Sequence, residues 1–241
     1  MTNNPIDQWI DICNRRDNLS FLSNEHNSWT YLELSQMLKS CKVDIESKEP
    51  STCMIEGDYS LHSVAWLIAG LSYGWRMVPV VSKNISIINK RKDISHATYS
   101  VSSASNWQMK LLPLSEVDTE VNKEERGVIL FSSGSTGEAK AMCQDLSPRL
   151  HDLGKQKSKP TCMGLLLLFD HIGGLNTLLS GLQKSSHLVA PLERSPSIMA
   201  NLIERYSVRV LPCSPTFLNM MYLDSIFDDF NLKSLRLVTY G

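Results

Sequence analysis

Short apolar runs alternate along this chain with segments in which apolar residues recur every three or four positions. The short runs predict buried strands, and the periodic segments predict helices with one apolar face. In the first half we expect helices over residues 5–16, 30–41, 61–71 and 85–91, and strands over 19–22, 28–30, 53–56, 76–81, 97–101 and 108–112. Such alternation is typical of parallel sheets joined by right-handed crossovers.

The second half continues the same alternation. We expect strands over 128–131, 163–168, 187–190, 208–211 and 235–240, helices over 195–206 and 215–222, and a Gly-rich helix or turn over 173–182. The charged segment 115–126 predicts a surface loop and marks a candidate break between two subdomains. The whole pattern predicts an α/β protein of layered αβα architecture with mainly parallel sheets.

Composition narrows the class of protein without identifying it. The 241 residues are 42% hydrophobic and 20% charged, which is within the ordinary range of globular proteins. A formal net charge of −1 predicts no general attraction to nucleic acid or to anionic lipid. The six cysteines include no Cys-x-x-Cys pair and no spacing typical of a metal site, so we expect reduced thiols and no metal held by protein ligands alone.

The chain carries no signal for secretion or for membrane insertion. Its first residues lack the basic and apolar regions of a signal peptide. Apolar runs such as Leu165–Phe169 are far too short to cross a bilayer. We therefore expect a soluble cytoplasmic protein.

The segment 131–140 carries the strongest chemical signal. It follows the apolar run Gly127–Leu130 and consists of hydroxyl side chains and glycines that end at a lysine. Glycines can turn successive backbone N–H groups toward an anion, hydroxyls add donors, and a lysine adds a positive charge. The candidate phosphate-binding residues are Ser132, Ser133, Gly134, Ser135, Thr136, Gly137 and Lys140. The alternative interpretation is a solvated Ser/Gly turn between two strands.

The run from Ser132 to Lys140 resembles the phosphate-loop signature of the adenylate-forming superfamily. That superfamily comprises acyl-CoA synthetases, fatty acyl-AMP ligases, luciferases and the adenylation domains of nonribosomal peptide synthetases. Its usual pattern is Ser/Thr-Ser-Gly-Ser/Thr-Thr-Gly-x-Pro-Lys, and the chain departs from it only at Ala139, where proline is usual. A second departure is Gln144, which replaces a histidine often found after the lysine.

The resemblance implies an ATP-dependent acid–thiol ligase. A carboxylic acid would react with ATP in the presence of Mg²⁺ to form an acyl-adenylate, and CoA or the phosphopantetheine of an acyl carrier protein would then accept the acyl group. The loop would hold the β- and γ-phosphates, and Lys140 would act catalytically by stabilising the departing pyrophosphate. Neither the acid nor the acceptor follows from the sequence.

Three further segments are candidates for the acid pocket. His171, Gly173 and Gly174 follow the predicted strand 163–168, where ligands of parallel sheets usually bind, although a histidine in the core is the alternative. Ser214-Pro215 predicts the start of a helix, and the resemblance implies that Phe217 on it contacts the substrate. The resemblance also places Tyr240 and Gly241 in a segment that supports the adenine and acyl groups.

The resemblance covers the N-terminal part of the large domain of an adenylate-forming enzyme. Residues 1–241 therefore predict a partial AMP-binding domain that lacks the ribose-binding aspartate and the small domain with its catalytic lysine. We expect such a fragment to self-associate or to need a complementing chain, because apolar surface would be uncovered. The alternatives are an inactive nucleotide-binding module, or pseudoenzyme, and one half of a split ligase.

Overall fold

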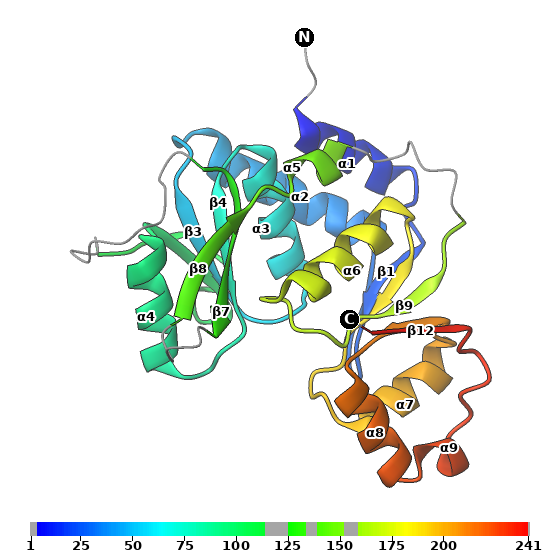
Figure 1. Ribbon diagram of the computed structural model, residues 1–241. Helices are drawn as coiled ribbons and strands as arrows, with labels where there is room; N and C mark the ends of the chain where they lie inside the picture. The colour runs from blue at the N-terminus through cyan, green and yellow to red at the C-terminus, as the bar shows by residue number, and fades with distance from the viewer. Residues whose placement is uncertain (1–3, 114–124, 134–138, 152–158, 241) are drawn as a thin grey trace.

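Two six-stranded sheets organise the molecule (Figure 1). The computed structural model describes residues 4–113, 125–133, 139–151 and 159–240. One sheet, the β9 sheet, has the order β12 (Leu237–Thr239), β11 (Val210–Pro212), β9 (Cys162–Gly164), β10 (His187–Val189), β1 (Ser20–Ser23) and β2 (Ser28–Thr30). Its strands pair in parallel except for β2, which is antiparallel to β1.

The second sheet, the β7 sheet, carries the predicted phosphate loop. Its order is β6 (Lys110–Leu111), β5 (Tyr99–Ser102), β3 (Thr52–Glu56), β4 (Arg76–Val80), β7 (Gly127–Ser133) and β8 (Ala139–Gln144). The four central strands are parallel, and β6 and β8 are antiparallel to their neighbours at the two edges. The expectation of mainly parallel sheets is confirmed.

Helices cover both faces of both sheets. Between the sheets lie α1 (Pro5–Asn14), α2 (Tyr31–Glu46), α3 (Leu61–Ser72), α5 (Ser147–His151) and α6 (Ile172–Gln183). The outer face of the β7 sheet is covered by α4 (Ile85–Ser95), and that of the β9 sheet by α7 (Pro196–Tyr206), α8 (Pro215–Leu223) and α9 (Ile226–Asp229). The predicted αβα layering is therefore present around each sheet. Among the described residues, no helix is long and apolar enough to cross a membrane.

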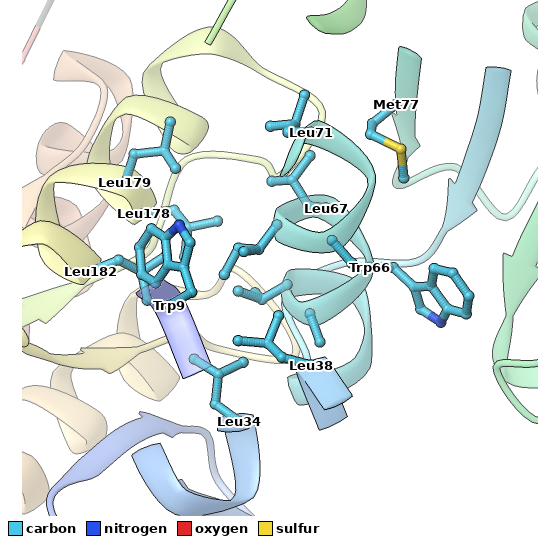
Figure 2. Close-up of a cluster of buried hydrophobic side chains, with 14 of the residues drawn as sticks. Trp9, Leu34, Leu38, Trp66, Leu67, Leu71, Met77, Leu178, Leu179 and Leu182 are labelled. Atoms are coloured by element: carbon cyan, nitrogen blue, oxygen red, sulfur yellow. The ribbon is translucent and has the colours of Figure 1, made fainter. Parts of the chain in front are cut away.

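The core of the middle layer fixes where α6 lies. Trp9 of α1, Leu38 of α2, Leu67 of α3 and Leu178 of α6 belong to one cluster of fully buried side chains (Figure 2). Burial of a leucine or tryptophan of this kind contributes about 1.5–3 kcal/mol or more to folding. Because α6 packs against α1, α2 and α3 in this way, the position of its first residue, and so of the segment that precedes it, is fixed.

The predicted helix starts are confirmed. Glu33 and Thr30 form a capping box, in which Thr30 Oγ1 accepts from the Glu33 N–H at 3.3 Å and Glu33 Oε2 accepts from the Thr30 N–H at 2.7 Å. Ser214 caps α8 by accepting from the Phe217 N–H at 3.2 Å, with Pro215 in the first turn. The helix predicted over 30–41 continues to Glu46, five residues further than expected.

The strand expected over 163–168 is the main error of the sequence-based prediction. Strand β9 ends at Gly164, and residues 165–171 form a loop that leads into α6 (the β9–α6 loop). Leu165, Leu166 and Phe169 of this loop are buried, whereas Leu168 is 42% exposed. Apolar residues predict burial but not which groups satisfy the backbone. In this loop, the side chains of Tyr59 and Arg194 donate hydrogen bonds to carbonyl oxygens that would otherwise pair with a neighbouring strand.

Four short elements among the described residues were not expected, namely β8, α5, α9 and a 3-10 helix at Ser103–Ser105. The candidate subdomain break at 115–126 falls largely outside the described residues. The strands on its two sides, β6 and β7, belong to the same sheet.

Candidate functional site

The two ends of the predicted phosphate loop are adjacent strands. β7 and β8 are antiparallel, with Ser132 opposite Lys140 and Ser133 opposite Ala139. The side chains of Ser132 and Lys140 are both exposed. A hydroxyl and an ammonium group at paired positions can approach one anion together. Gly134, Ser135, Thr136 and Gly137 lie outside the described residues. The pairing of β7 with β8 is compatible both with a phosphate loop and with a solvated Ser/Gly turn.

Glycine at the start of β7 sets the register of the hairpin. Gly127 has a φ of +133°, and a Cβ at this position would overlap the backbone carbonyl of Gln144. A side chain at position 127 would therefore push the strands apart. The close approach fixes Val128 opposite Gln144, and from there the ladder runs without interruption to Ser132 and Lys140.

A cavity of about 880 Å³ lies beside α6 at the β9 sheet. Four of the predicted pocket residues line it: His171 before α6, Gly173 of α6, Phe217 of α8 and Tyr240 after β12. The other lining residues are Met163, Leu166, Leu167, Leu168, Ile172, Asn176, Thr177, Ser180, Lys184, Arg194, Val210, Pro212, Cys213, Ser214 and Thr239. Gly241 lies outside the described residues.

The lining of this cavity is apolar with a few polar groups on one side. The polar side chains of α6, at Asn176, Thr177 and Ser180, recur at helical spacing along the cavity. The charged residues among the described lining are Lys184 and Arg194, and no aspartate or glutamate is found there. Cavities of this kind bind small molecules with an apolar body and a polar or negatively charged group.

His171 serves as the N-cap of α6. Its Nδ1 accepts from the Gly173 N–H at 3.2 Å, while the ring lines the cavity. A neutral imidazole that accepts at Nδ1 carries its hydrogen on Nε2. His171 can therefore donate a hydrogen bond from Nε2 to an acceptor in the cavity.

The two predicted glycines have different surroundings. Gly173 lines the cavity, and an added Cβ would lie 2.9 Å from Leu167 Cδ1. Gly174 is buried, and a Cβ there would overlap the Leu168 carbonyl oxygen and lie 2.5 Å from the Tyr59 hydroxyl. Gly174 thus lets the β9–α6 loop approach the helix backbone, whereas Gly173 faces the cavity.

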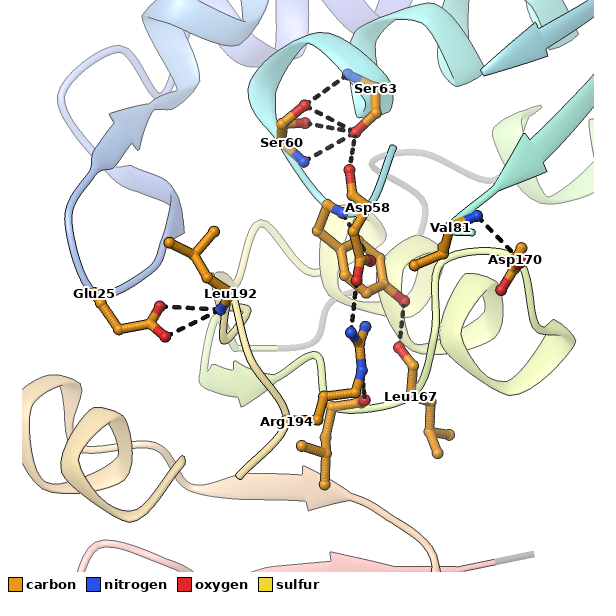
Figure 3. Close-up of polar contacts among 11 residues, drawn as sticks. Glu25, Asp58, Ser60, Ser63, Val81, Leu167, Asp170, Leu192 and Arg194 are labelled. Carbon is orange, nitrogen blue, oxygen red and sulfur yellow. Dashed lines mark hydrogen bonds and ion pairs between the residues drawn. The ribbon is translucent and has the colours of Figure 1, made fainter. Parts of the chain in front are cut away.

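Side chains from two distant segments donate to carbonyl groups of the β9–α6 loop (Figure 3). The Tyr59 hydroxyl donates to the Leu167 carbonyl at 3.0 Å. Arg194 Nε donates to the Leu166 carbonyl at 2.6 Å, and Arg194 Nη1 pairs with the Asp58 carboxylate at 2.6 Å. The loop is therefore tied to the segment before α3 and to the segment before α7.

Asp170 is the third anchor of the loop. Its Oδ2 accepts from the Val81 N–H at 3.2 Å and from Arg91 Nη1 at 2.6 Å (Figure 3 shows the Val81 contact). The Arg91 guanidinium lies over the ring of Phe131, 5.2 Å from its centroid. No pattern in the sequence identifies Tyr59, Arg91 or Arg194, because their partners are backbone groups or residues far away in the chain. The polar positions of α6 do carry a signal, because Asn176, Thr177 and Ser180 have the i, i+1, i+4 spacing of one helix face.

The part of the chain that the structure describes contains neither a protein-built metal site nor an activated thiol. Among the residues that are described, no group of three or more His, Cys, Asp or Glu side chains could hold a metal ion. All six cysteines are free thiols, as expected. Burial raises the pKa of Cys213, which lines the cavity, and raises that of Cys162 to about 12. Both thiols are therefore protonated and weakly nucleophilic at neutral pH.

Comparison with known proteins gives a consistent result. The family model described as AMP-binding enzyme matches residues 76–241, which include β7, β8 and all residues that line the cavity. A "Probable 4-coumarate–CoA ligase 2" of Dictyostelium discoideum is 33% identical over 128 residues, which cover 49% of this chain and 23% of the relative. The chain thus matches about a quarter of the length of such curated relatives.

Solved structures share the fold at low sequence identity. The inhibitor-bound N-terminal domain of FACL13 from Mycobacterium tuberculosis superposes with a TM-score of 0.75 at 14% identity, over 98% of this chain and 69% of that one. A red-emitting luciferase from Phrixothrix hirtus gives a TM-score of 0.77 at 16% identity, over 99% of this chain and 55% of the luciferase chain.

Proposed function

Because the chain belongs to the family of AMP-binding enzymes, we propose that it forms the N-terminal part of an ATP-dependent ligase that activates a carboxylic acid. The acid would become an acyl-adenylate, and a thiol of CoA or of a carrier-protein phosphopantetheine would then take the acyl group. The observation that carries this proposal is the family match, because it spans both the β7–β8 hairpin and the cavity beside α6.

The hairpin would bind the polyphosphate of ATP. Ser132 and Lys140 are exposed at paired positions, and the residues between them supply hydroxyls and glycine N–H groups. A carboxylate oxygen of the acid attacks the α-phosphorus, and pyrophosphate leaves. Lys140 stabilises the charge that develops on the leaving pyrophosphate. Mg²⁺ bound with the polyphosphate supplies further neutralisation, and it binds mostly phosphate and water oxygens, so it needs no cage of protein ligands.

The cavity would bind the acid. Its apolar lining accommodates the body of the acid, with Phe217 as part of the wall and Gly173 as a place for close approach. The Nε2–H of His171 can donate to a carboxylate oxygen before the attack. Tyr240 and Gly241 would support the adenine and acyl groups, as the family resemblance implies.

The direct test is ATP–pyrophosphate exchange with a panel of acids. The panel contains 4-coumarate and short, medium and long fatty acids, and both the 241-residue chain and the full product of its gene are assayed. We expect exchange that depends on one class of acid. Binding of MgATP by a folded protein without exchange for any acid would favour the inactive nucleotide-binding module instead.

A second assay separates the acceptors. Acyl-adenylate formed in the first step is offered CoA or a phosphopantetheinylated carrier protein, and thioester is measured by mass spectrometry. Exchange that requires a second polypeptide would support the split ligase.

Association with another chain is part of the proposal. Among the described strands, β12 pairs with β11 alone, and its residues Leu237 and Val238 are 52% and 37% exposed. An edge strand with exposed apolar side chains can pair with another chain. Sedimentation over a range of concentrations would measure self-association, and a strictly monomeric chain would contradict it.

A further inference from the structure

Arg91 contacts a residue next to the candidate phosphate site and a residue next to the candidate acid pocket. Phe131 directly precedes Ser132 of the hairpin, and Asp170 directly precedes His171 of the cavity. Arg91, on α4, pairs with the Asp170 carboxylate and lies over the Phe131 ring. Phe131 and Asp170 are 39 residues apart in the sequence, and the Arg91 side chain contacts both.

The contacts are well shielded from water. The Arg91 side chain is 20% exposed and that of Asp170 is 10% exposed, and their N–O distance is 2.6 Å. The same carboxylate oxygen also accepts from the Val81 N–H, so Asp170 has two partners that hold it in place. A short charge-assisted hydrogen bond in such surroundings resists opening more than an exposed pair does.

A guanidinium group suits this double role. It is planar, so its edge can donate to a carboxylate while its face stacks on an aromatic ring. A lysine ammonium group is a compact charge and has no flat face to stack. The arrangement therefore depends on arginine and not merely on a positive charge.

We propose that Arg91 is a positioning residue that holds the Ser132 end of β7 and the His171 end of the β9–α6 loop in one fixed relation. A nucleotide bound at the hairpin then also orders the loop that lines the acid cavity. For the identity of the nucleotide, this inference rests on the proposed function. Its mechanical part, the link between the two segments, does not depend on any ligand.

Hydrogen exchange of the ligand-free chain tests the link. In Arg91→Met, amides in residues 127–133 and 165–171 should exchange about tenfold faster than in the wild type. The matched control is Arg205→Met, because the Arg205 guanidinium lies 5.0 Å from the centroid of the Tyr206 ring and donates to the Glu25 carbonyl, away from both subsites. The control should leave both segments unchanged. Unchanged exchange in Arg91→Met would overturn the proposal.

Addition of MgATP tests the coupling. In the wild type we expect protection of β7 and β8 and also of residues 165–171. In Arg91→Met the protection of β7 and β8 should persist while that of 165–171 is lost. Equal protection of 165–171 in both proteins would overturn the coupling and leave the proposed function intact. Absence of protection anywhere in the wild type would instead contradict nucleotide binding, and the ligand-free comparison would still decide the link.

A milder variant covers the case in which Arg91→Met does not fold. Phe131→Leu removes the ring and keeps the Arg91–Asp170 ion pair. Without ligand, residues 165–171 of this variant should exchange at nearly the wild-type rate. With MgATP, the protection of these residues should be at least about fivefold smaller than in the wild type, because coupling between two sites usually changes affinity by about fivefold or more. Full MgATP protection of 165–171 in Phe131→Leu would contradict a path through the ring.

Discussion

The Tyr59 hydroxyl donates to the Leu167 carbonyl at 3.0 Å, across 108 residues of sequence. The Tyr59 ring also packs edge-on against Phe169, with the ring centroids 5.2 Å apart. This pair of contacts holds the β9–α6 loop at the place where a continuation of strand β9 was expected. At this point a side-chain hydroxyl donates to the backbone carbonyl, whereas elsewhere in the sheet the donor is an N–H of a neighbouring strand.

Replacement of Tyr59 by phenylalanine should weaken the loop without disturbing its packing. The ring contact remains, and the Leu167 carbonyl loses its donor, so we expect a loss of about 1 kcal/mol in the free energy of unfolding. Urea denaturation measures this. Tyr222→Phe is the control, because Tyr222 is 73% exposed on α8 and should change stability by less than about 0.5 kcal/mol. Equal effects of the two changes would contradict an anchoring role for Tyr59.

Replacement of Lys140 by alanine should affect the chemistry far more than the fold. Lys140 is exposed on β8, so we expect the melting temperature to be nearly unchanged. Loss of one charge aimed at the leaving pyrophosphate should lower ATP–pyrophosphate exchange by about 10²–10³-fold. Lys110→Ala is the matched control, because Lys110 is exposed on β6 of the same sheet. Unaltered exchange in the Lys140 variant would mean that the hairpin does not bind phosphate.

The adjacent glycines of α6 should respond differently to alanine. Gly174→Ala places a methyl group on the backbone oxygen of Leu168, which cannot move away freely, so we expect a loss of at least about 2 kcal/mol in unfolding free energy. Gly173→Ala meets only the end of the Leu167 side chain, and alanine favours the helix by about 0.5–1 kcal/mol, so the net change should be small. Thermal unfolding of both variants decides between these outcomes. Comparable losses of unfolding free energy in the two variants would contradict the difference between the backbone contact of Gly174 and the side-chain contact of Gly173.

Stability should fall in mild acid because of two partly buried histidines. Burial lowers the pKa of His187, whose Nε2 lies 2.8 Å from Ser23 Oγ, and burial also lowers that of His62. Since the unfolded chain then binds more protons than the folded one, the free energy of unfolding decreases as pH falls through and below about 6.5. Urea unfolding at about pH 7.5 and about pH 5.5 should show this decrease.

The variant His187→Gln isolates the contribution of that ring. Its unfolding free energy should change less between the two pH values than that of the wild type, and the remainder should include the contribution of His62. A decrease of the same size in His187→Gln would exclude His187 as a source.

Local signals in the sequence were reliable where neighbouring residues decide the outcome. Thr30 and Glu33 are three positions apart and cap their helix together, and Ser214 with Pro215 starts α8 in the same way. The phosphate loop could be predicted because all its candidate ligands lie within one short segment. These features need no knowledge of which strands pair.

The β9–α6 loop shows where such reasoning stops. The run Leu165–Phe169 is as apolar as a buried strand, and the expected burial holds for Leu165, Leu166 and Phe169. It does not hold for Leu168, which is 42% exposed, and the strand conformation is absent. Whether a carbonyl pairs with a strand or with a side chain depends on what the tertiary structure brings beside it. Tyr59 and Arg194 reach this loop from segments that lie 108 and 28 residues away from their partners in the sequence.

The sequence by itself determined the layered α/β architecture and the helix caps, because periodicity and short-range spacing carry them, and it predicts phosphate binding at residues 132–140. The tertiary structure decided that His171, Phe217 and Tyr240 share one cavity, and that Arg91 joins Phe131 to Asp170. Contacts of this second kind link residues far apart in the chain. They are specified by the packing of whole sheets and helices, which no local pattern encodes.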